Sequence, residues 1–482
     1  MFDRVIKSVA VIGGGPAGIA SVNELIHVSA NGESFLQKNK RPALPAFEKV
    51  VCFEQNSDIG GVWNYFKVPD PKLPSLESNE YDNPNKIYDF PKIPDMKTLL
   101  KTSFQKPYIK LSTKKLEDEA KWNRNAAYKD LFTNIPEKFM RFSYTPYKRI
   151  SKGRILEPLV SMDDVKNYLD DLIRDFAPFS NIESWYTEEF DAVVAANGHC
   201  NIPYIPKVDG FKEFVELFPN IVQHSKSFRD VNDFKDKDVL LCGSGTSSAD
   251  LYQYLAPVAK SVTISQRSKS VYGWIQECFD KSPELKFKPR IKRYLQNGSV
   301  QFDDDTFGKY DKIVLSTGYH YHFPFLKPES EIIKIYQQES SPISKIGNLY
   351  LYTFSIKDNT FATAGIPTVG LMFHGMEYSA AAIAGVFSGA KKLPRLEEQY
   401  DWNDSRVNIE QPEVPHRYQG FFLDKIEDQF LNPLFSLAAP GRLNPLKIDD
   451  WKPEQVEEST PALKKAFFAL KSGKYSSSDL LK

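Results

Sequence analysis

Two glycine-rich stretches carry the clearest chemical potential in this chain. Residues 8–18 (SVAVIGGGPAG) place an apolar run before glycines at GxGxxG spacing, and residues 238–250 (DVLLCGSGTSSAD) repeat the arrangement about 230 positions later. Such glycines allow a tight strand-to-helix turn and a close approach of backbone N–H groups to a phosphate. The helix N-terminus adds free N–H donors and a partial positive charge. Each loop is therefore predicted to hold a dinucleotide pyrophosphate, a purely structural turn being the alternative.

The predicted cofactor-binding residues of the first loop are Gly13, Gly15, Pro16, Ala17 and Gly18, and those of the second are Gly243, Gly245, Ser247, Ser248 and Asp250. Ser248 stands where the motif has its third glycine. A serine is still small enough for close packing of the helix on the strand.

The strand predicted over residues 49–54 ends in Glu54, where an acid can accept hydrogen bonds from ribose hydroxyls. Gly61, Val62 and Trp63 follow, and this pattern lets the backbone pass close to a flat ligand that the indole covers. A solvated charge and a turn with a core tryptophan are the respective alternatives. Taken together with the first glycine loop, these residues indicate FAD rather than NAD at the first site.

At the second site the corresponding strand end carries Arg267, about twenty residues after Gly243. A guanidinium suits the 2′-phosphate of NADPH, whereas an acid there would repel it. The second loop is therefore predicted to bind NADPH.

Composition limits the remaining possibilities. The chain has 482 residues, with 62 basic and 62 acidic side chains, so no charge excess favours nucleic acid. The four cysteines form no CxxC, which argues against a dithiol enzyme or a zinc site and favours a reducing compartment. We expect no bound metal. Neither a signal peptide nor a transmembrane span is evident, and a cytoplasmic location is expected, with peripheral association with the endoplasmic reticulum surface as an open alternative.

The predicted elements give an α/β fold with two Rossmann-like dinucleotide-binding domains, in which the NADPH domain interrupts the FAD domain. Residues 66–127 lack periodicity and are interpreted as an irregular insertion, and a short helix is expected to end just before Thr133 and Asn134. The first part of the FAD-binding domain is expected at residues 1–210, and the NADPH-binding domain at 211–317. The chain then returns to the FAD-binding domain over residues 318–395. Residues 396–482 form a C-terminal extension without assigned chemistry.

The order of these motifs resembles that of the flavin-containing monooxygenases. Residues 218–228 (FPNIVQHSKSF) are similar to the family marker FxGxxxHxxx followed by an aromatic residue, with Asn220 in place of the glycine. Gly60–Trp63 and the segment with Thr317 and Gly318 also look like family motifs, and Thr133–Asn134 matches the Thr-Asn pair beside the flavin. The likeness covers roughly residues 5–395, and the Pro-rich insertion looks most like that of fungal members.

The resemblance implies an enzyme that binds FAD and NADPH, with Thr317 and Gly318 among the cofactor-binding residues. It would use O2 to oxygenate a small soft nucleophile, such as a thiol, sulfide or amine, through a C4a-hydroperoxyflavin. Asn134 is the predicted catalytic residue, hydrogen bonding near the flavin. For His224 a structural role and a link between the domains both remain open.

One departure from the family pattern concerns residues 177–190, where the family usually has a further strand and a β-meander. Because the FAD domain would then be shortened, a relative of the family without catalytic activity is one alternative to the monooxygenase. A Baeyer–Villiger or N-hydroxylating monooxygenase is another, although Phe228 stands where Baeyer–Villiger enzymes favour Trp. The missing CxxC argues against a disulfide reductase. The sequence names neither the substrate nor the oligomeric state.

Overall fold

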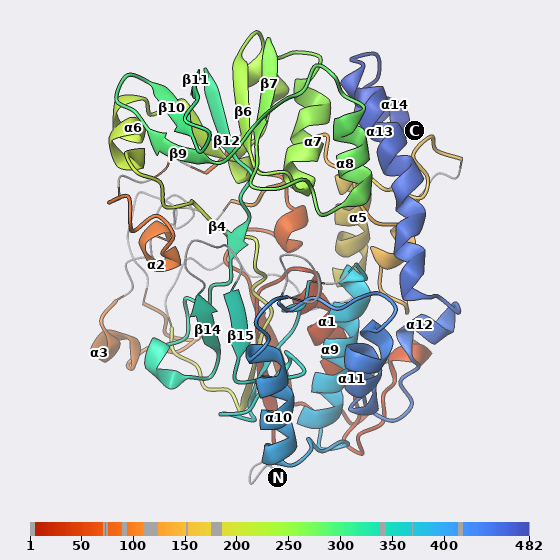
Figure 1. Ribbon diagram of the computed structural model, residues 1–482. Coiled ribbons are helices and arrows are strands. Elements are labelled where there is room, and N and C mark those ends of the chain that lie inside the picture. The colour runs from red at the N-terminus through yellow and green to blue at the C-terminus, as the bar shows by residue number, and fades with distance from the viewer. Residues whose placement is uncertain are drawn as a thin grey trace.

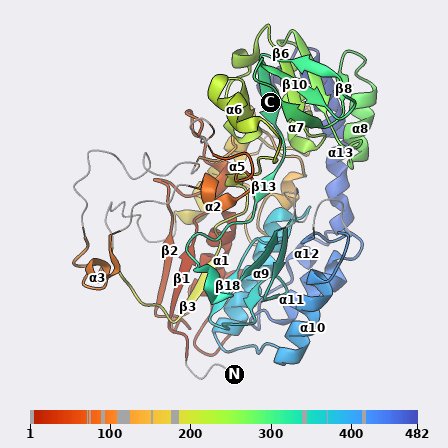
Figure 2. The same ribbon diagram turned by 60° about the vertical axis from the view of Figure 1, so that its left-hand side comes forward.

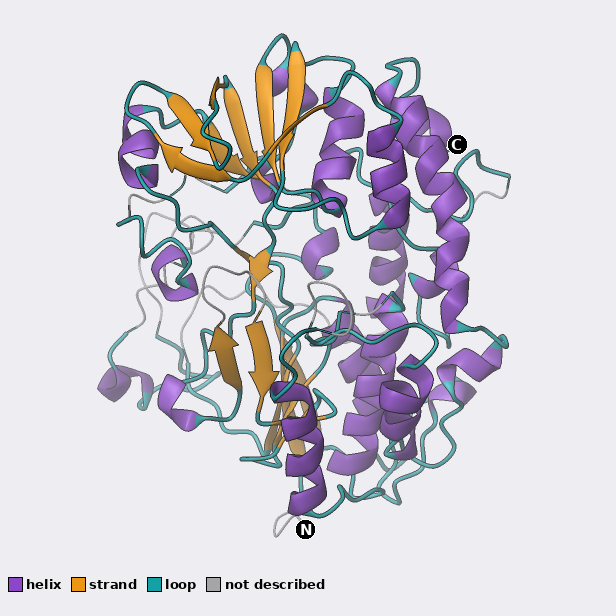
Figure 3. Cartoon of the chain, viewed as in Figure 1, coloured by secondary structure: helices purple, strands orange, loops and turns teal. Residues whose placement is uncertain are grey.

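The computed structural model describes residues 5–70, 73, 76–88, 94–108, 124–150, 153–174, 186–337, 344–368, 370–412 and 418–481. Two parallel sheets lie at opposite ends of the molecule, and a cluster of helices runs along one side of both (Figure 1). Figure 3 shows this separation directly, with most strands on one side and the longer helices on the other. The mixed α/β class predicted from the sequence is confirmed.

The first sheet contains the first glycine loop. Its strand order is β16-β17-β18-β3-β1-β2. Strands β2, β1, β3 and β18 are parallel, and β17 and β16 extend the sheet in antiparallel fashion. The strands are β1 (Ser8–Ile12), β2 (Lys49–Phe53), β3 (Ala192–Ala195), β16 (Leu349–Tyr350), β17 (Phe354–Ser355) and β18 (Phe361–Thr363).

The second sheet contains the second glycine loop and is parallel throughout, in the order β5-β12-β6-β7-β8. A three-stranded antiparallel sheet, β11-β10-β9, lies beside it. These strands are β5 (Val222–His224), β6 (Asp238–Cys242), β7 (Ser261–Ser265), β8 (Lys286–Lys288), β9 (Ile291–Tyr294), β10 (Ser299–Phe302), β11 (Phe307–Lys309) and β12 (Lys312–Leu315).

The chain crosses between the two sheets twice, and the crossings pair with each other. Strand β4 (Ile202–Pro203) runs antiparallel to β13 (Tyr319–His320). Each crossing follows a parallel strand, β3 in one case and β12 in the other. The pairing gives the link between the sheets two hydrogen-bonded segments instead of one. The residue numbers at which the domains divide remain a prediction.

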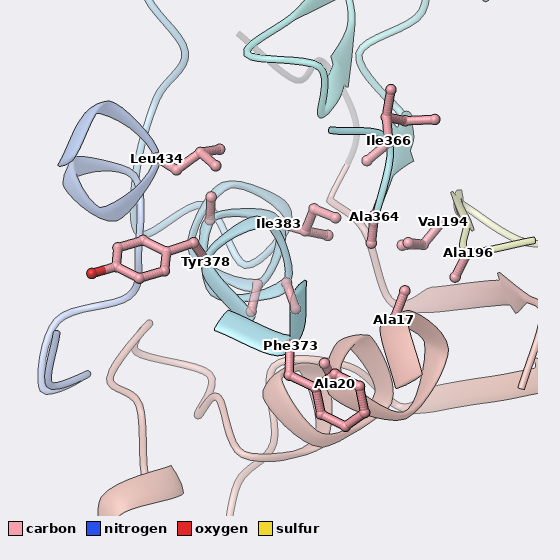
Figure 4. Packing of buried hydrophobic residues seen from close by; sticks show 14 of the residues in the cluster. Ala17, Ala20, Val194, Ala196, Ala364, Ile366, Phe373, Tyr378, Ile383 and Leu434 are labelled. Carbon is pink, nitrogen blue, oxygen red and sulfur yellow. The ribbon is translucent and has the colours of Figure 1, made fainter. Parts of the chain in front are cut away.

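Helix α1 (Pro16–Ile26) packs against the long buried helix α9 (Met372–Phe387). Figure 4 shows Ala20 of α1 close to Phe373 of α9, and Ala17 close to Ala364 and to Val194 of β3. The small alanine side chains let the helices and the sheet approach closely, so this core fixes α1 and the glycine loop before it.

The remaining helices are α2 (Pro84–Ile87), α3 (Met96–Leu99), α5 (Met162–Ile173), α6 (Phe211–Leu217), α7 (Thr246–Leu255), α8 (Gly273–Asp280), α10 (Leu396–Val407), α11 (Asn432–Ser436), α12 (Pro445–Ile448), α13 (Thr460–Lys471) and α14 (Ser477–Leu480). Strands β14 (Lys334–Gln337) and β15 (Ser344–Gly347) form a separate hairpin. Seen from another side, α3 stands out from the body of the molecule (Figure 2).

The expected short helix before Thr133 is absent from the described residues. A turn at residues 129–130 occupies this place, and a 3-10 helix follows at Glu137–Phe139. The segment is instead fixed by contacts with elements distant in sequence, such as the hydrogen bond from Thr133 N to Val160 O at 2.9 Å. A local helix prediction has no access to such contacts.

The shortened stretch at 177–190 falls partly outside the described residues, which resume at residue 186. Residues 186–190 form no strand, but they lie beside β2. The rings of Phe190 and Phe53 meet edge to face at 5.8 Å, and Glu188 forms an ion pair with Lys49. Thr187 bonds back to the insertion, its hydroxyl donating to Leu99 O at 2.7 Å. Among the described strands, β2 is therefore the edge of the first sheet.

Candidate functional site

A cavity of about 520 Å³ lies between the two sheets. Its first wall is built from the carboxyl ends of the parallel strands β1, β2, β3 and β18, where an open α/β sheet usually binds its ligand. Its second wall comes from α7 and α8 beside the second sheet. The predicted residues that line it are Gly13, Gly15, Pro16, Ala17, Glu54, Gly61, Val62, Trp63, Thr133, Asn134 and Asp250.

The first glycine loop has the geometry that its spacing predicts. Gly13 adopts φ +106°, and a Cβ there would lie 2.5 Å from Ala196 O. A Cβ on Gly18 would lie 1.9 Å from Gly13 O, so the helix could not start so close to the strand with a larger residue. Gly15 caps α1 without any side-chain hydrogen bond, and no acid occupies the first turn. The N-terminal N–H groups of α1 are therefore available for an anion.

Glu54 lies at the end of β2, as predicted. Its Oε2 accepts a hydrogen bond from Gly14 N at 2.7 Å, and its Oε1 accepts from Asn56 N at 2.9 Å. These contacts hold the carboxylate beside the glycine loop. Asn56 Nδ2 also donates to Oε1 at 3.0 Å, so Oε2 is the oxygen that retains a lone pair for a ribose hydroxyl.

The second loop repeats the first. Gly243 adopts φ +122°, and a Cβ there would lie 2.5 Å from Ser316 O, the counterpart of the Gly13–Ala196 contact. Gly245 caps α7 without a side-chain hydrogen bond, and nothing lies within 4 Å of the position of a Cβ on it. The backbone at Gly245 therefore leaves open space next to the start of α7. Thr246, the first residue of α7, lines the cavity and was not predicted from the sequence.

Arg267 follows β7 and is exposed. The segment that contains it lies alongside the second glycine loop, because Ser244 Oγ donates to Ser268 O at 3.2 Å and Gly243 N donates to Ser265 O at 2.8 Å. A guanidinium at this place can reach an anion bound at the loop.

Thr133 and Asn134 differ in what surrounds them. Thr133 is buried, and its hydroxyl donates to Ile135 O at 3.0 Å and accepts from Val160 N at 3.1 Å. Asn134 is exposed to the cavity, and its side-chain amide has no hydrogen-bond partner within the described part of the chain. Thr133 therefore shapes the turn, and the role of Asn134 toward a ligand stays a prediction.

Asp250 lines the cavity but is engaged with other side chains. The hydroxyl of Tyr128 donates to Asp250 Oδ2, and Gln253 Nε2 donates to Oδ1 at 2.8 Å. Burial raises the pKa of Asp250 to about 6. This carboxyl thus joins α7 to the loop that carries Asn134, a role that the sequence analysis did not assign to it.

The remaining predicted residues are not among those that line the cavity, namely Gly18, Gly243, Gly245, Ser247, Ser248, Arg267, Thr317 and Gly318. Thr317 and Gly318 sit at the paired crossings. The hydroxyl of Thr317 donates to Tyr204 O at 2.5 Å, and Tyr204 N donates to Gly318 O at 2.9 Å. In the described structure these bonds of Thr317 and Gly318 join the β13 crossing to the β4 crossing.

The histidine of the marker segment is buried at the end of β5. Its Nδ1 accepts from Lys226 N at 3.1 Å, and burial lowers the pKa of His224 to about 3, so the ring is neutral. Lys226 forms a buried ion pair with Asp70 of the insertion at 2.6 Å. Arg229 adds a hydrogen bond to Phe66 O at 2.7 Å. Lys226 of the marker segment and Arg229 just after it therefore fasten the start of the insertion to the end of β5 in the second sheet.

Sequence reasoning missed several residues of the cavity wall. His322 lines it, and its Nε2 lies 2.9 Å from Asn85 Oδ1 in the insertion. Leu463 and Phe467 of α13 line it from the C-terminal extension. No local motif marks these positions, although the apolar spacing of 463 and 467 does indicate one face of a helix.

The residues present fit two dinucleotides. Two helix N-termini without side-chain caps start at the glycine loops and supply N–H donors for two pyrophosphates. Glu54 beside the first loop suits a ribose diol, and Arg267 beside the second suits a 2′-phosphate. Among the described residues, no group of His, Cys, Asp and Glu is arranged to hold a metal ion.

Comparison with known proteins agrees with this geometry. The model of the family "Flavin-binding monooxygenase-like" matches residues 183–283 and 281–411. A trimethylamine monooxygenase of Methylocella silvestris is 29% identical over 465 residues, which cover 93% of this chain and 89% of that protein. The flavin-containing monooxygenase FMO GS-OX-like 1 of Arabidopsis thaliana is 27% identical over 448 residues, covering 87% of this chain and 80% of that protein.

Among solved structures, the S-allyl-L-cysteine S-oxygenase from Allium sativum superimposes with a TM-score of 0.65 at 22% identity, covering 97% of this chain and 98% of that one. At this identity the likeness supports the fold, with its two dinucleotide-binding sheets, and nothing finer.

Over residues 183–411 the chain matches the flavin-binding monooxygenase-like family, and along most of its length it is similar to curated flavin-dependent monooxygenases. It is an enzyme, and its cofactors are FAD and NADPH. The relatives named here are from bacteria and plants, so a particular likeness to fungal members has no support. Within the described residues, no helix has the length and apolar character needed to cross a membrane. The cytoplasmic location stays a prediction, and nothing supports attachment to the endoplasmic reticulum.

Proposed function

We propose that this protein uses NADPH and O2 to oxygenate soft nucleophiles, namely sulfides, thiols and amines. The observation that carries the proposal is a cavity shared by the two glycine-loop sheets, with the exposed Asn134 in its wall. The named functions of similar proteins, trimethylamine oxygenation and S-oxygenation, support nitrogen and sulfur nucleophiles as the substrate class.

The bound flavin supplies hydride acceptance from NADPH and the activation of O2. The protein's own residues then have three tasks. The N-termini of α1 and α7 bind the two pyrophosphates and so set the distance between the cofactors. Trp63 and Met376 contribute apolar walls that exclude water from the reacting centre.

The third task falls to Asn134. An amide can donate and accept hydrogen bonds without taking up or losing a proton. At the cavity surface it can therefore orient a bound nicotinamide or flavin edge throughout a reaction cycle in which charges change. In this proposal Asn134 is the catalytic residue, and the other predicted residues are cofactor-binding.

The cavity also bears on the alternatives. Both acidic side chains in the cavity wall already accept two or more hydrogen bonds. Glu54 accepts from Gly14 and Asn56, whereas Asp250 accepts from Tyr128 and Gln253. Neither acid is free of hydrogen-bond partners, and His199, His320 and His322 also line the cavity. A reaction in which the cofactors supply the chemistry requires no general base, and the four cysteines without a CxxC motif disfavour dithiol chemistry.

The experiment that tests the proposal is spectroscopic. Purified protein reconstituted with FAD should absorb at about 450 nm, as oxidised protein-bound flavin does. NADPH added without O2 should bleach this band, and air should restore it. Protein that cannot be reconstituted with FAD is the outcome expected of a non-catalytic relative, and it would overturn the proposal. A screen with ketones, amines and sulfides separates Baeyer–Villiger and N-hydroxylating activity from S-oxygenation.

A further inference from the structure

The C-terminal extension reaches back into the cavity. After the chain leaves the first sheet, α13 rises along the side of the molecule and ends beside α7 and α8 of the second sheet (Figure 1). Its buried stripe consists of Ala462, Leu463, Ala466, Phe467 and Leu470. Ion pairs hold its exposed side to α8 and the following turn, between Lys464 and Glu277 and between Lys471 and Glu284, the latter at 2.6 Å.

Two residues of this stripe form part of the cavity wall, Leu463 and Phe467. Phe467 is 1% exposed and its ring lies 5.7 Å from that of Tyr252 on α7. Leu463 belongs to a small core with Phe132, which precedes the Thr133–Asn134 turn and also lines the cavity. Both side chains are therefore packed against neighbouring elements.

The same segment holds the loop that carries Asn134. Ser459 Oγ donates to Asn134 O at 3.2 Å, and Ser477 Oγ donates to Asp130 Oδ1 at 3.0 Å. From the opposite side, the hydroxyl of Tyr254 on α7 donates to Asp130 O at 2.8 Å. The Asn134 loop is thus held between α7 and the C-terminal segment, which places Leu463 and Phe467 in the neighbourhood of Asn134.

The chemistry of this end of the cavity differs from that of the glycine loops. Leu131, Phe132, Trp274, Leu463 and Phe467 supply apolar surface. The acid that α7 contributes to the cavity wall, Asp250, accepts hydrogen bonds from Tyr128 and Gln253. Such an apolar surface does not suit a pyrophosphate, whose binding needs N–H donors and positive charge. It suits an apolar substituent that is removed from water when the substrate binds.

We propose that Leu463 and Phe467 are specificity-determining residues that limit the size of the apolar group carried by the substrate nucleophile. This inference rests on the proposed function. It assigns a role to the C-terminal extension, which closes the apolar end of the cavity and sets how large a sulfide or amine can bind next to Asn134.

The test compares a small with a bulky sulfide, dimethyl sulfide and methyl phenyl sulfide, through kcat/KM for sulfoxide formation. Phe467→Ala should raise kcat/KM for methyl phenyl sulfide relative to that for dimethyl sulfide about tenfold. This is the range expected when a pocket changes by several carbon atoms. Leu463→Phe should lower the same ratio. Phe468→Ala is the matched control, because Phe468 is the next residue of the same helix and does not line the cavity.

Thermal unfolding of each variant accompanies the kinetics. Should Phe467→Ala fail to fold, Phe467→Leu and Leu463→Phe test the same wall with smaller changes. A ratio that stays constant in the folded wall variants, or that moves equally in Phe468→Ala, overturns the inference. If the wild-type enzyme oxidises NADPH but oxygenates neither sulfide nor any amine, the proposed function itself has failed. This result differs from a constant substrate ratio in the wall variants, which would overturn only the inference on Leu463 and Phe467.

Discussion

The hydroxyl of Tyr128 donates a hydrogen bond to the half-buried carboxylate of Asp250, and this contact joins the loop that ends in Asn134 to helix α7 of the second sheet. The two residues are 122 positions apart in sequence. Gln253 occupies the other carboxylate oxygen. The contact thus sets the position of the Asn134 loop relative to the second glycine loop, from which α7 starts.

The Asp250 carboxyl makes stability depend on pH in a defined direction. Burial raises its pKa from an ordinary 3.8 to about 6. Between these values the folded chain keeps a proton that the unfolded chain has lost, so a rise in pH favours unfolding. The free energy of unfolding should therefore fall by about 2–3 kcal/mol between about pH 4 and pH 6 on account of this group.

Denaturant unfolding at several pH values checks this prediction. The difference between the wild-type protein and Asp250→Asn should change across that window, because the variant lacks the titrating group. Tyr128→Phe is the companion variant, since it removes the hydrogen bond and keeps the buried carboxyl. A constant difference between wild type and Asp250→Asn would contradict the prediction.

The second glycine loop offers a matched pair of substitutions. Gly243→Ala forces a Cβ to 2.5 Å from Ser316 O at a φ of +122°, whereas a Cβ on Gly245 meets nothing within 4 Å. We expect Gly243→Ala to lower the unfolding temperature clearly and Gly245→Ala to leave it nearly unchanged.

For NADPH binding we expect a clear effect of Gly245→Ala, the substitution that should leave the unfolding temperature nearly unchanged. Gly245→Ala should raise the KM for NADPH about tenfold, because the added methyl group occupies the open space in which we place the pyrophosphate. An unchanged KM in a correctly folded Gly245→Ala protein would place the pyrophosphate elsewhere.

Arg267 is predicted to recognise the 2′-phosphate. Arg267→Ala should raise the KM for NADPH about tenfold, through the loss of a charge-assisted bond, and leave that for NADH nearly unchanged. Lys269→Ala serves as the control, since it removes an exposed positive charge two residues away. Equal effects on both nucleotides, or an equal effect of the control, would reject this role.

A buried charge cluster anchors the C-terminal extension to the core. Arg442 pairs with Glu24 of α1 at 2.8 Å and with Glu377 of α9, and all three side chains are at most 2% exposed. Arg442→Met should destabilise the fold by about 3–5 kcal/mol, because two buried carboxylates lose their counter-charge.

Chemical denaturation measures this loss, with Arg395→Met as the surface control. Arg395 pairs with Glu398 at 2.8 Å, but both side chains are more than half exposed, and its removal should have little measurable effect. Replacing both acids with Gln in the Arg442→Met background should restore part of the stability. No restoration would show that the cluster does not act through its charges.

Much of the candidate site follows from local sequence. Gly13, Gly15, Gly18 and Glu54 could be predicted because a strand, a tight turn and a helix start are consecutive in the chain. Their backbone requirements exclude most other residues, so the pattern itself carries the geometry.

The rest depends on contacts across the sequence. The wall residues Leu463 and Phe467, the Arg442 cluster and the Tyr128–Asp250 bond each join segments that only the folded chain brings together. The segment before Thr133 was wrongly predicted as a helix for the same reason. Its backbone makes one local turn bond, from Leu131 N to Tyr128 O, and otherwise bonds to Val160 and Met162.

The fate of the oxygen atoms tests the central claim most directly. Purified enzyme loaded with FAD is supplied with NADPH, methyl phenyl sulfide and isotope-labelled O2, and the sulfoxide is analysed by mass spectrometry. We predict one labelled oxygen atom per sulfoxide molecule, with NADPH consumed in equal amount to the product. Sulfoxide without label, or NADPH oxidation that yields hydrogen peroxide and no sulfoxide or amine oxide with any substrate tried, would contradict the assignment of this chain as a monooxygenase of soft nucleophiles.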